Sequence, residues 1–310
     1  MIENNKKIPI IAVVGPTASG KTSLGIAVAK RFGGEIISAD SMQIYKGFPI
    51  ASAAPSDEEK KQVPHHLVEI LEPTEKFSVA DFVSLAGKTI KEVHSRGKIP
   101  VIVGGTGLYI NSLIDGIVFN SEKTDETLRE NIEAEFDRLG GEIMLKRLYE
   151  IDKETASKLS VSDKRRIVRA FEVYRSTGLT ISEQNELSKK DGSPYEPVII
   201  GINFADRENL YNRINKRVDI MLQNGLLEEA EKSVNKGITA AQAIGHKELV
   251  PYLNGECSLD DAVEILKRET RRYAKRQLTW FRRDNRINWI YADEEDFLNK
   301  AFQIIEERMK

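Results

Sequence analysis

The stretch Gly15-Pro16-Thr17-Ala18-Ser19-Gly20-Lys21-Thr22 constrains the fold more than any other part of this chain, because it matches the phosphate-cradling pattern G-x-x-x-x-G-K-[ST]. The apolar run 10–14 predicts a buried strand before it, and residues 23–32 predict a helix that stops at Gly33-Gly34. Together these parts predict a P-loop. Its backbone N–H groups, the ammonium of Lys21 and the hydroxyl of Thr22 suit a diphosphate or triphosphate with Mg²⁺. An ordinary strand-to-helix turn is the alternative, and the agreement of all three parts disfavours it.

Short apolar strand candidates alternate with helical stretches along the chain, which predicts an α/β fold with a parallel sheet flanked by helices. We place strands at 10–14, 35–39, 100–103, 198–202 and 287–291. The gap between the third and fourth strands is too long for one crossover, and it contains helical patterns at 126–139, 142–150 and 163–177. We therefore expect a P-loop NTPase-like core domain of residues 1–117 and 196–310, with residues 118–195 inserted as a mainly helical domain.

Charge is distributed unevenly, since the formal net charge is only −2 whereas residues 267–286 hold nine Lys or Arg against two acids. A local basic surface suits a nucleic acid, and Tyr273, Trp280 and Phe281 lie among these cations. A solvated charged helix is the alternative. The single Cys257 excludes an internal disulfide framework, and no long apolar run offers a membrane span. We expect a cytoplasmic, monomeric protein that does not enter a membrane.

Many P-loop enzymes place an acidic side chain beside the phosphates, at the carboxyl end of another strand. The strand at 100–103 is followed by Gly104-Gly105-Thr106-Gly107 without an acid, whereas the strand at 35–39 is followed by Asp40. Asp40 is therefore the candidate general base. A helix N-cap, or an indirect partner of Lys21 or Mg²⁺, is the alternative role for this carboxylate.

A second helix supplies candidate cations for the same cleft. Asp206 predicts the N-cap of a helix that ends near Asn224-Gly225 and has an apolar stripe on one face. Arg213 and Arg217 are four residues apart and lie together at the flank of that stripe, where they could point into a cleft.

Six motifs in order resemble the bacterial tRNA dimethylallyltransferase family, also called tRNA isopentenyl transferases, from about residue 8 to residue 291. They are the P-loop, Asp40-Ser41-Met42-Gln43-Ile44-Tyr45, Gly104-Gly105-Thr106-Gly107-Leu108-Tyr109, and the segments 164–174, 242–249 and 274–283. The resemblance implies transfer of a dimethylallyl group from dimethylallyl diphosphate to N6 of adenosine 37, which follows the anticodon, in tRNAs that read codons beginning with U. The P-loop would then grip the diphosphate of the prenyl donor.

The resemblance also implies roles for single residues. Asp40 matches the general base, while Thr17, Lys21, Thr22 and Arg217 match the groups that stabilise the departing diphosphate, with Mg²⁺ bridging its oxygens. Contacts with the tRNA anticodon stem-loop are implied for Asp40, Ser41, Met42, Gln43, Thr106, Arg129, Arg165, Arg166, Ile167, Val168 and Arg169. From the basic stretch we add Arg272, Lys275 and Arg276 as candidate phosphate contacts.

Three histidines and one lysine need separate interpretation. His246 stands where the family more often has Tyr, and Lys164 stands where Pro is common. A lone histidine is more often a packing variant than a catalyst, so we assign His246 no role. The pair His65-His66 lacks further metal ligands nearby in sequence, and we interpret it as structural.

Two other classes of function stay open alongside the prenyltransferase. One is a P-loop small-molecule kinase or an adenylate prenyltransferase that acts on free nucleotide, and the other is a non-catalytic, nucleotide-dependent RNA-binding protein. A kinase is expected to carry an arginine-rich lid and has little use for the basic stretch 267–286. A binding module has no need of an acid such as Asp40 at the crevice.

Overall fold

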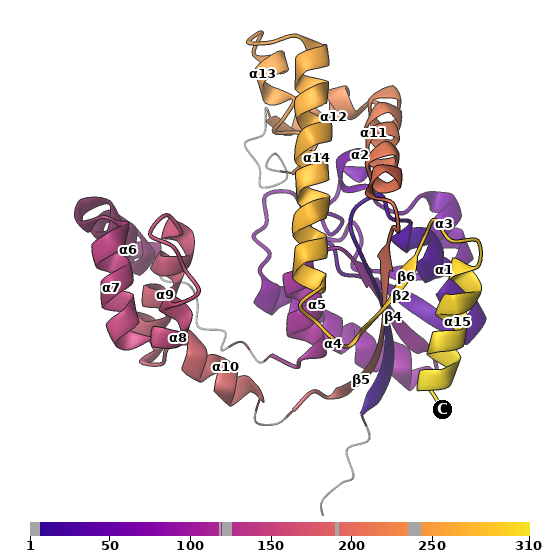
Figure 1. The fold of residues 1–310 in the computed structure, drawn as a ribbon, viewed down its shortest axis with the longest axis horizontal. Helices are drawn as coiled ribbons and strands as arrows, with labels where there is room; N and C mark the ends of the chain where they lie inside the picture. Colours follow the sequence, from indigo (N-terminus) through magenta and orange to yellow (C-terminus); the bar gives the residue numbers. More distant parts are fainter. Residues whose placement is uncertain (1–6, 118, 120–125, 190–191, 235–242) are drawn as a thin grey trace, which may run out of the picture. The chain divides into compact units, whose positions relative to one another are not determined.

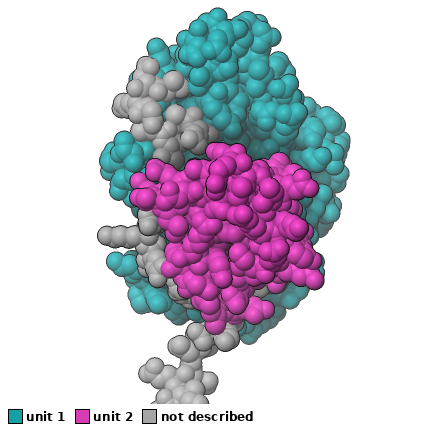
Figure 2. Space-filling view, turned by 90° about the vertical axis from the view of Figure 1, so that its left-hand side faces the viewer, with its two compact units in different colours: residues 1–114, 194–310 teal, residues 115–193 magenta. Residues whose placement is uncertain are grey.

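The computed structural model describes residues 7–117, 119, 126–189, 192–234 and 243–310. The chain divides into two compact units, shown in different colours in Figure 2. The core unit comprises Met1–Ile114 with Pro194–Lys310, and the inserted unit comprises Asp115–Ser193. None of the helices described is both long and apolar enough to cross a lipid bilayer.

A six-stranded parallel sheet forms the centre of the core unit, in the order β3-β2-β4-β1-β5-β6 (Figure 1). The strands are β1 Ile8–Val14, β2 Gly34–Ser38, β3 His65–His66, β4 Ile99–Gly104, β5 Tyr195–Asn203 and β6 Ile287–Tyr291. The α/β prediction and its five strands are confirmed, although β2 ends at Ser38, one residue before the predicted end. The edge strand β3 was not predicted, because two histidines carry no apolar pattern.

Some helices of the core unit cover the two faces of this sheet, and others pack with one another in a separate hydrophobic cluster. The helices described in this unit are α1 Lys21–Phe32, α2 Pro49–Ser52, α3 Asp57–Gln62, α4 Val79–Ser95, α5 Gly107–Ile114, α11 Arg207–Gln223, α12 Leu226–Val234, α13 Val250–Leu253, α14 Leu259–Phe281 and α15 Phe297–Arg308. Side chains alternate across β1, so Ile10 and Ala12 pack with α4 and α5 whereas Ile11 and Val13 pack with α1 and α15. The sheet is therefore buried on both faces, and its function lies at the strand ends.

The inserted unit has a small helical core of its own. Its helices are α6 Glu126–Leu139, α7 Gly141–Ile151, α8 Lys153–Ala156, α9 Lys164–Thr177 and α10 Ile181–Lys189. The predicted helices at 126–139, 142–150 and 163–177 are confirmed to within one residue at each end. Ile132 and Phe136 of α6 pack with Met144 of α7 and with Ile167 and Phe171 of α9. The predicted boundary residue 118 lies outside the described residues.

Candidate active site

The P-loop lies between the end of β1 and the start of α1. A Cβ at Gly15 would lie 2.8 Å from the carbonyl oxygen of Ile202, and Gly20 has a φ of 94°, so both positions require glycine. Ala18 holds a φ of 61°, which is uncommon for a residue with a side chain. The Nε of Arg213 donates to the carbonyl oxygen of Ala18 at 2.9 Å. Arg213 is not among the residues that line the cavity beside the P-loop, so the expectation that it points into the cleft is not met, and its guanidinium instead holds the loop at Ala18.

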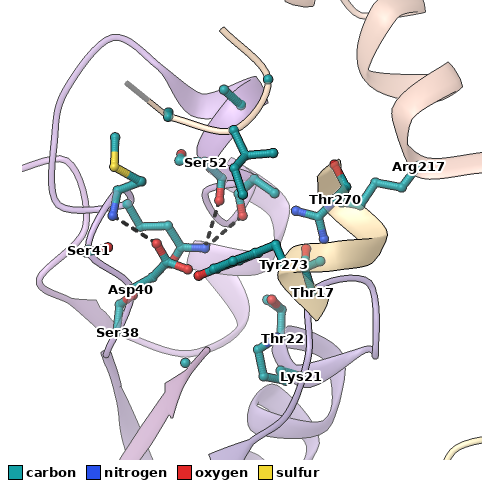
Figure 3. A pocket seen from close by; sticks show the side chains of 18 of the residues that line it. Thr17, Lys21, Thr22, Ser38, Asp40, Ser41, Ser52, Arg217, Thr270 and Tyr273 are labelled. Atoms are coloured by element: carbon teal, nitrogen blue, oxygen red, sulfur yellow. Dashed lines mark hydrogen bonds between the residues drawn. The ribbon is translucent and has the colours of Figure 1, made fainter. Parts of the chain in front are cut away.

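A cavity of about 270 Å³ lies next to the P-loop, entirely within the core unit (Figure 3). The predicted residues Thr17, Lys21, Thr22, Asp40 and Arg217 all line it. They come from the P-loop, the end of β2 and α11, and the cavity is completed by α14 and the segment before α13. Its apolar wall includes Ile36, Val103, Ile214, Val218, Met221, Ile244 and Leu266. One cavity thus offers cations, a carboxylate and an apolar surface.

The two cations of the cavity lack an acidic partner within the described part of the chain: no carboxylate lies within 4.0 Å of the Lys21 ammonium or the Arg217 guanidinium. Among the described residues, the Nζ of Lys21 donates to the carbonyl oxygen of Pro16, at 2.6 Å, and to no other acceptor. Burial, followed by the charge of Arg217, lowers the pKa of Lys21 to about 7, although Asp40 opposes the shift. Burial also lowers the pKa of Arg217. A bound anion would favour both charged forms, so this end of the cavity suits a diphosphate.

Asp40 follows β2 and faces the cavity from the side opposite Arg217 (Figure 3). Its Oδ1 accepts a hydrogen bond from the backbone N–H of Met42 at 2.9 Å. No helix begins at Asp40, since α2 starts only at Pro49, and this rules out the helix N-cap role. The bond from Met42 orients the carboxylate and leaves its other oxygen available to accept a proton.

Tyr273 of α14 points its hydroxyl toward Asp40 (Figure 3). Burial, followed by the negative charge of Asp40, raises the pKa of the Tyr273 phenol. The hydroxyl therefore stays protonated and can donate a hydrogen bond inside the cavity. The sequence indicated Tyr273 only as one aromatic residue of the basic stretch, because the pattern did not show which face of the helix it occupies.

Gln277 connects α14 to the P-loop. Its Oε1 accepts from the backbone N–H of Thr17 at 2.8 Å, and its Nε2 donates to the carbonyl oxygen of Gly105 at 2.9 Å. A Cβ at Gly105 would lie 2.3 Å from that Nε2, so the glycine makes room for the amide. The motifs gave Gln277 no role of its own, although a polar side chain on the otherwise apolar helix face of Ala274 and Phe281 is a detectable signal in the sequence.

The loop after β2 forms another wall of the cavity. Ser41, Met42 and Gln43 line it, and the backbone N–H of Ser41 donates to Oγ1 of Thr106 at 3.2 Å. Both ends of the Gln43 side-chain amide form hydrogen bonds inside the protein. Its Oε1 accepts from the hydroxyl of Ser38 at 2.8 Å, and its Nε2 donates to the backbone carbonyl oxygen of Ala53 at 2.9 Å. Gln43 therefore fixes the wall.

Residues 43–284 match the family model described as IPP transferase, and residues 8–68 match the model described as isopentenyl transferase. The chain belongs to the IPP transferase family. A tRNA dimethylallyltransferase of Acetivibrio thermocellus is 50% identical over 291 residues, which cover 93% of both chains.

Solved structures of this family have the same fold. The tRNA delta(2)-isopentenylpyrophosphate transferase of Staphylococcus epidermidis is 41% identical, with a TM-score of 0.70 over 97% of this chain and 100% of that one. A eukaryotic dimethylallyltransferase described as acting on tRNA is 28% identical, with a TM-score of 0.82 over 96% of this chain and 78% of that one. The resemblance deduced from the six motifs is thereby confirmed.

The cations of the basic stretch fall into two groups. In the first half of the stretch, Lys267 pairs with Asp219 at 2.9 Å, and Arg272 pairs with Glu269 at 2.6 Å. In the second half, no described carboxylate lies within 4.0 Å of the side chains of Lys275, Arg276, Arg282 and Arg283, and all four are exposed. Cations without a described carboxylate partner therefore gather at the end of α14 that is bonded to the P-loop and in the turn after it, whereas Arg286 pairs with Asp284 at 2.7 Å.

The candidate tRNA contacts of the inserted unit also differ in exposure. Arg165, Arg166 and Arg169 are exposed on α9, whereas Ile167 and Val168 are fully buried in the core of this unit. The side chains of Ile167 and Val168 therefore hold α9 in place and are not available to RNA. Outside α9, Arg129 pairs with Glu133 at 3.0 Å and with the buried Glu172 at 3.9 Å.

The histidines have structural surroundings. His246 is fully buried, its Nε2 lies 3.0 Å from Oε1 of Glu229, and that carboxylate also accepts the backbone N–H groups of Ile50 and Ala51. Gln242, which opens the same motif, lies outside the described residues. Nε2 of His66, in the edge strand β3, lies 2.7 Å from Oε2 of Glu35 in the neighbouring strand β2. No group of three or more His, Cys, Asp or Glu that could hold a metal occurs within the described ranges.

Proposed function

We propose that this protein transfers a dimethylallyl group from dimethylallyl diphosphate to the N6 amine of adenosine 37, next to the anticodon, in tRNAs that read codons beginning with U. Family membership and the names of the relatives support transfer of this group to tRNA. The observation that carries the proposal is one cavity in which Lys21 and Arg217, which have no carboxylate within 4.0 Å among the described residues, face the carboxylate of Asp40. The adenosine position and the codon class rest on the resemblance to the family.

The cations act on the donor. Lys21, Arg217 and the N–H groups of the P-loop neutralise the diphosphate as the bond between its oxygen and C1 of the allyl group breaks. The diphosphate leaves with the electron pair, and the allyl fragment develops positive charge against the apolar wall of the cavity. No water is activated in this reaction, which agrees with the lack of an acid after β4.

Asp40 acts on the acceptor. The lone pair of the adenine amine is delocalised into the ring, so the base must be held outside its stack with the amine aimed at C1. As the N6–C1 bond forms, an N6 proton passes to the carboxylate of Asp40. The products are the N6-(dimethylallyl)adenosine of the tRNA and the diphosphate.

Magnesium fits this site only through the donor. Thr22 lines the cavity beside Lys21 and offers one hydroxyl, and the described residues contain no cluster of acids that would hold the ion alone. Mg²⁺ commonly takes one or two protein oxygens and completes its shell with phosphate oxygens and water. When bound, the ion would supply additional charge neutralisation for the leaving diphosphate.

Labelled dimethylallyl diphosphate tests the proposal against the alternatives. The protein is incubated with this donor and either bulk unmodified tRNA or AMP, and parallel samples receive ATP with the same acceptors. We expect label to enter tRNA only. Label in AMP would favour an adenylate prenyltransferase, and phosphoryl transfer from ATP would favour a small-molecule kinase. Tight RNA binding without any transfer would favour a binding protein.

A further inference from the structure

Trp280 and Leu108 expose apolar surface beside the unpaired cations of α14. Trp280 is 38% exposed and Leu108 is 47% exposed, so both offer apolar surface to a ligand. A Cβ on Gly107 would lie 2.2 Å from Cδ1 of the Trp280 ring. The indole edge therefore rests on the backbone of Gly107 at the start of α5. This contact fixes the ring next to Thr106 and Leu108.

The charges around Trp280 suit a polyanion. Arg276 lies one turn before Trp280 on α14, and Arg283 lies in the turn just after the helix, where its backbone N–H donates to the carbonyl oxygen of Trp280 at 3.2 Å. Neither of them, nor Lys275 or Arg282, has a carboxylate within 4.0 Å among the described residues. An exposed indole bordered by unpaired cations combines the two features with which proteins bind unpaired nucleotides: a stacking surface and phosphate contacts.

The other aromatic residues of the stretch have different surroundings. Phe281 is 1% exposed and belongs to the core of the sheet, and Tyr273 faces the cavity. Trp280 is therefore the aromatic residue of this stretch whose ring is available to a ligand outside the cavity. It follows Gln277, which is bonded to both the P-loop and Gly105, so the helix end that carries it is firmly held.

We propose that Trp280, with Leu108, forms a stacking surface for an unpaired base of the anticodon loop, while the flanking cations contact the loop phosphates. This proposal rests on the proposed function, because the RNA is the acceptor tRNA. Stacking on this surface would hold the loop open beside the cavity and so favour extrusion of the neighbouring adenine toward Asp40.

Salt dependence separates stacking from charge. The dissociation constant of a synthetic, unmodified anticodon stem-loop is measured at several salt concentrations for the wild type and for Trp280→Ala, Trp280→Phe and Lys275→Ala. We expect Trp280→Ala to weaken binding at least about fivefold with an unchanged slope of log K against log salt, and Trp280→Phe to retain most of the affinity. Lys275→Ala should flatten the slope by about 0.7. Leu298→Ala removes a similarly exposed side chain elsewhere and should change neither quantity.

A fluorescence measurement gives a second readout of stacking that does not depend on the dissociation constant. The chain has two tryptophans, so Trp289→Phe leaves Trp280 as the single indole. Stacking should quench its emission on addition of the stem-loop. Unchanged emission together with unchanged affinity of Trp280→Ala would overturn the proposal, as would an equal loss in Trp280→Phe. If the wild type transfers the prenyl group but the affinity and fluorescence results contradict stacking, the proposal of a stacking surface is wrong and the proposed function stands. If the wild type binds no tRNA, both fail.

Discussion

At the scale of single residues, Asp40 has the clearest chemical role. Asp40→Asn keeps the size of the side chain and its bond to Met42 but removes the proton acceptor. We expect prenyl transfer to fall by roughly a hundredfold or more, as loss of a positioned general base should cause. Single-turnover rates at saturating substrates and a tRNA dissociation constant measure the two effects. The affinity for tRNA should stay close to the wild-type value. Near-normal turnover would show that Asp40 has only a structural role.

Lys21 gives a prediction about pH. Its pKa is about 7 in the protein without ligand, and a bound diphosphate must raise it. Binding therefore takes up a proton above pH 7, so affinity for inorganic diphosphate should fall with rising pH between about 7 and the ordinary lysine range near 10. Below pH 7 Lys21 is already charged and contributes no slope.

Calorimetry with inorganic diphosphate measures this linkage, and Lys21→Met supplies the control because its slope reports only the ionisation of the ligand. The wild type should lose up to about tenfold more affinity per pH unit than the variant. If the affinity of the wild type and that of Lys21→Met depended on pH in the same way, the Lys21 ammonium would not contact the diphosphate.

The site residues that the sequence predicted lie at recognisable positions after strands, whereas those it missed depend on how a distant helix packs. Lys21 and Asp40 follow strands at recognisable spacings, so chain order alone brings them to one sheet edge. Gln277 and Tyr273 lie far along the chain on a helix whose orientation no local pattern fixes. The ion pairs of Arg272 and Arg129, and the burial of Ile167, depend on tertiary packing in the same way.

At the scale of elements, α14 links a basic surface to the donor loop through Gln277. Gln277→Leu removes both hydrogen bonds while keeping the volume of the side chain, and it leaves the N–H of Thr17 unpaired. We expect affinity for inorganic diphosphate to fall by roughly tenfold with little change in tRNA affinity, because an unsatisfied buried group costs about 1–3 kcal/mol.

Thr89→Val is the matched control, since that buried hydroxyl donates to the carbonyl oxygen of Leu85, one turn earlier on α4, and contacts no residue of the P-loop among the bonds described. Melting temperatures of both variants show the general effect of losing a buried polar group. If Gln277→Leu lowered only the melting temperature, by as much as Thr89→Val, the link to the P-loop would have no functional effect.

The basic face of α14 gives a second prediction at this scale. Replacing Arg272, Lys275 and Arg276 with Ala should weaken tRNA binding and flatten the salt slope by about 1–2 units, if two or three of them touch phosphates. Among single variants, Arg272→Ala should flatten it least, because Glu269 already neutralises that guanidinium. A triple variant with lower thermal stability and an unaltered slope would move the RNA contacts to the inserted unit, around Arg165, Arg166 and Arg169.

At the scale of the whole molecule, the pattern of strands predicted the fold because each buried parallel strand is a short apolar run with a helix after it. The edge strand β3 escaped prediction, since its pairing with β2 is set by the sheet and not by its own two residues. The order of the strands, with β1 between β4 and β5, is likewise a property of the assembled sheet.

In the proposed reaction, the exocyclic amine of the adenosine next to the anticodon attacks the prenyl donor. Two synthetic anticodon stem-loops test it most directly: one has adenosine at that position, and the other has purine riboside, which lacks only the amine. With dimethylallyl diphosphate, mass spectrometry of the digested RNA should find one dimethylallyl group on the adenosine of the first stem-loop and none on the second, although both bind with similar affinity. Prenylation of the purine stem-loop, or of another nucleotide in the first, would contradict the account.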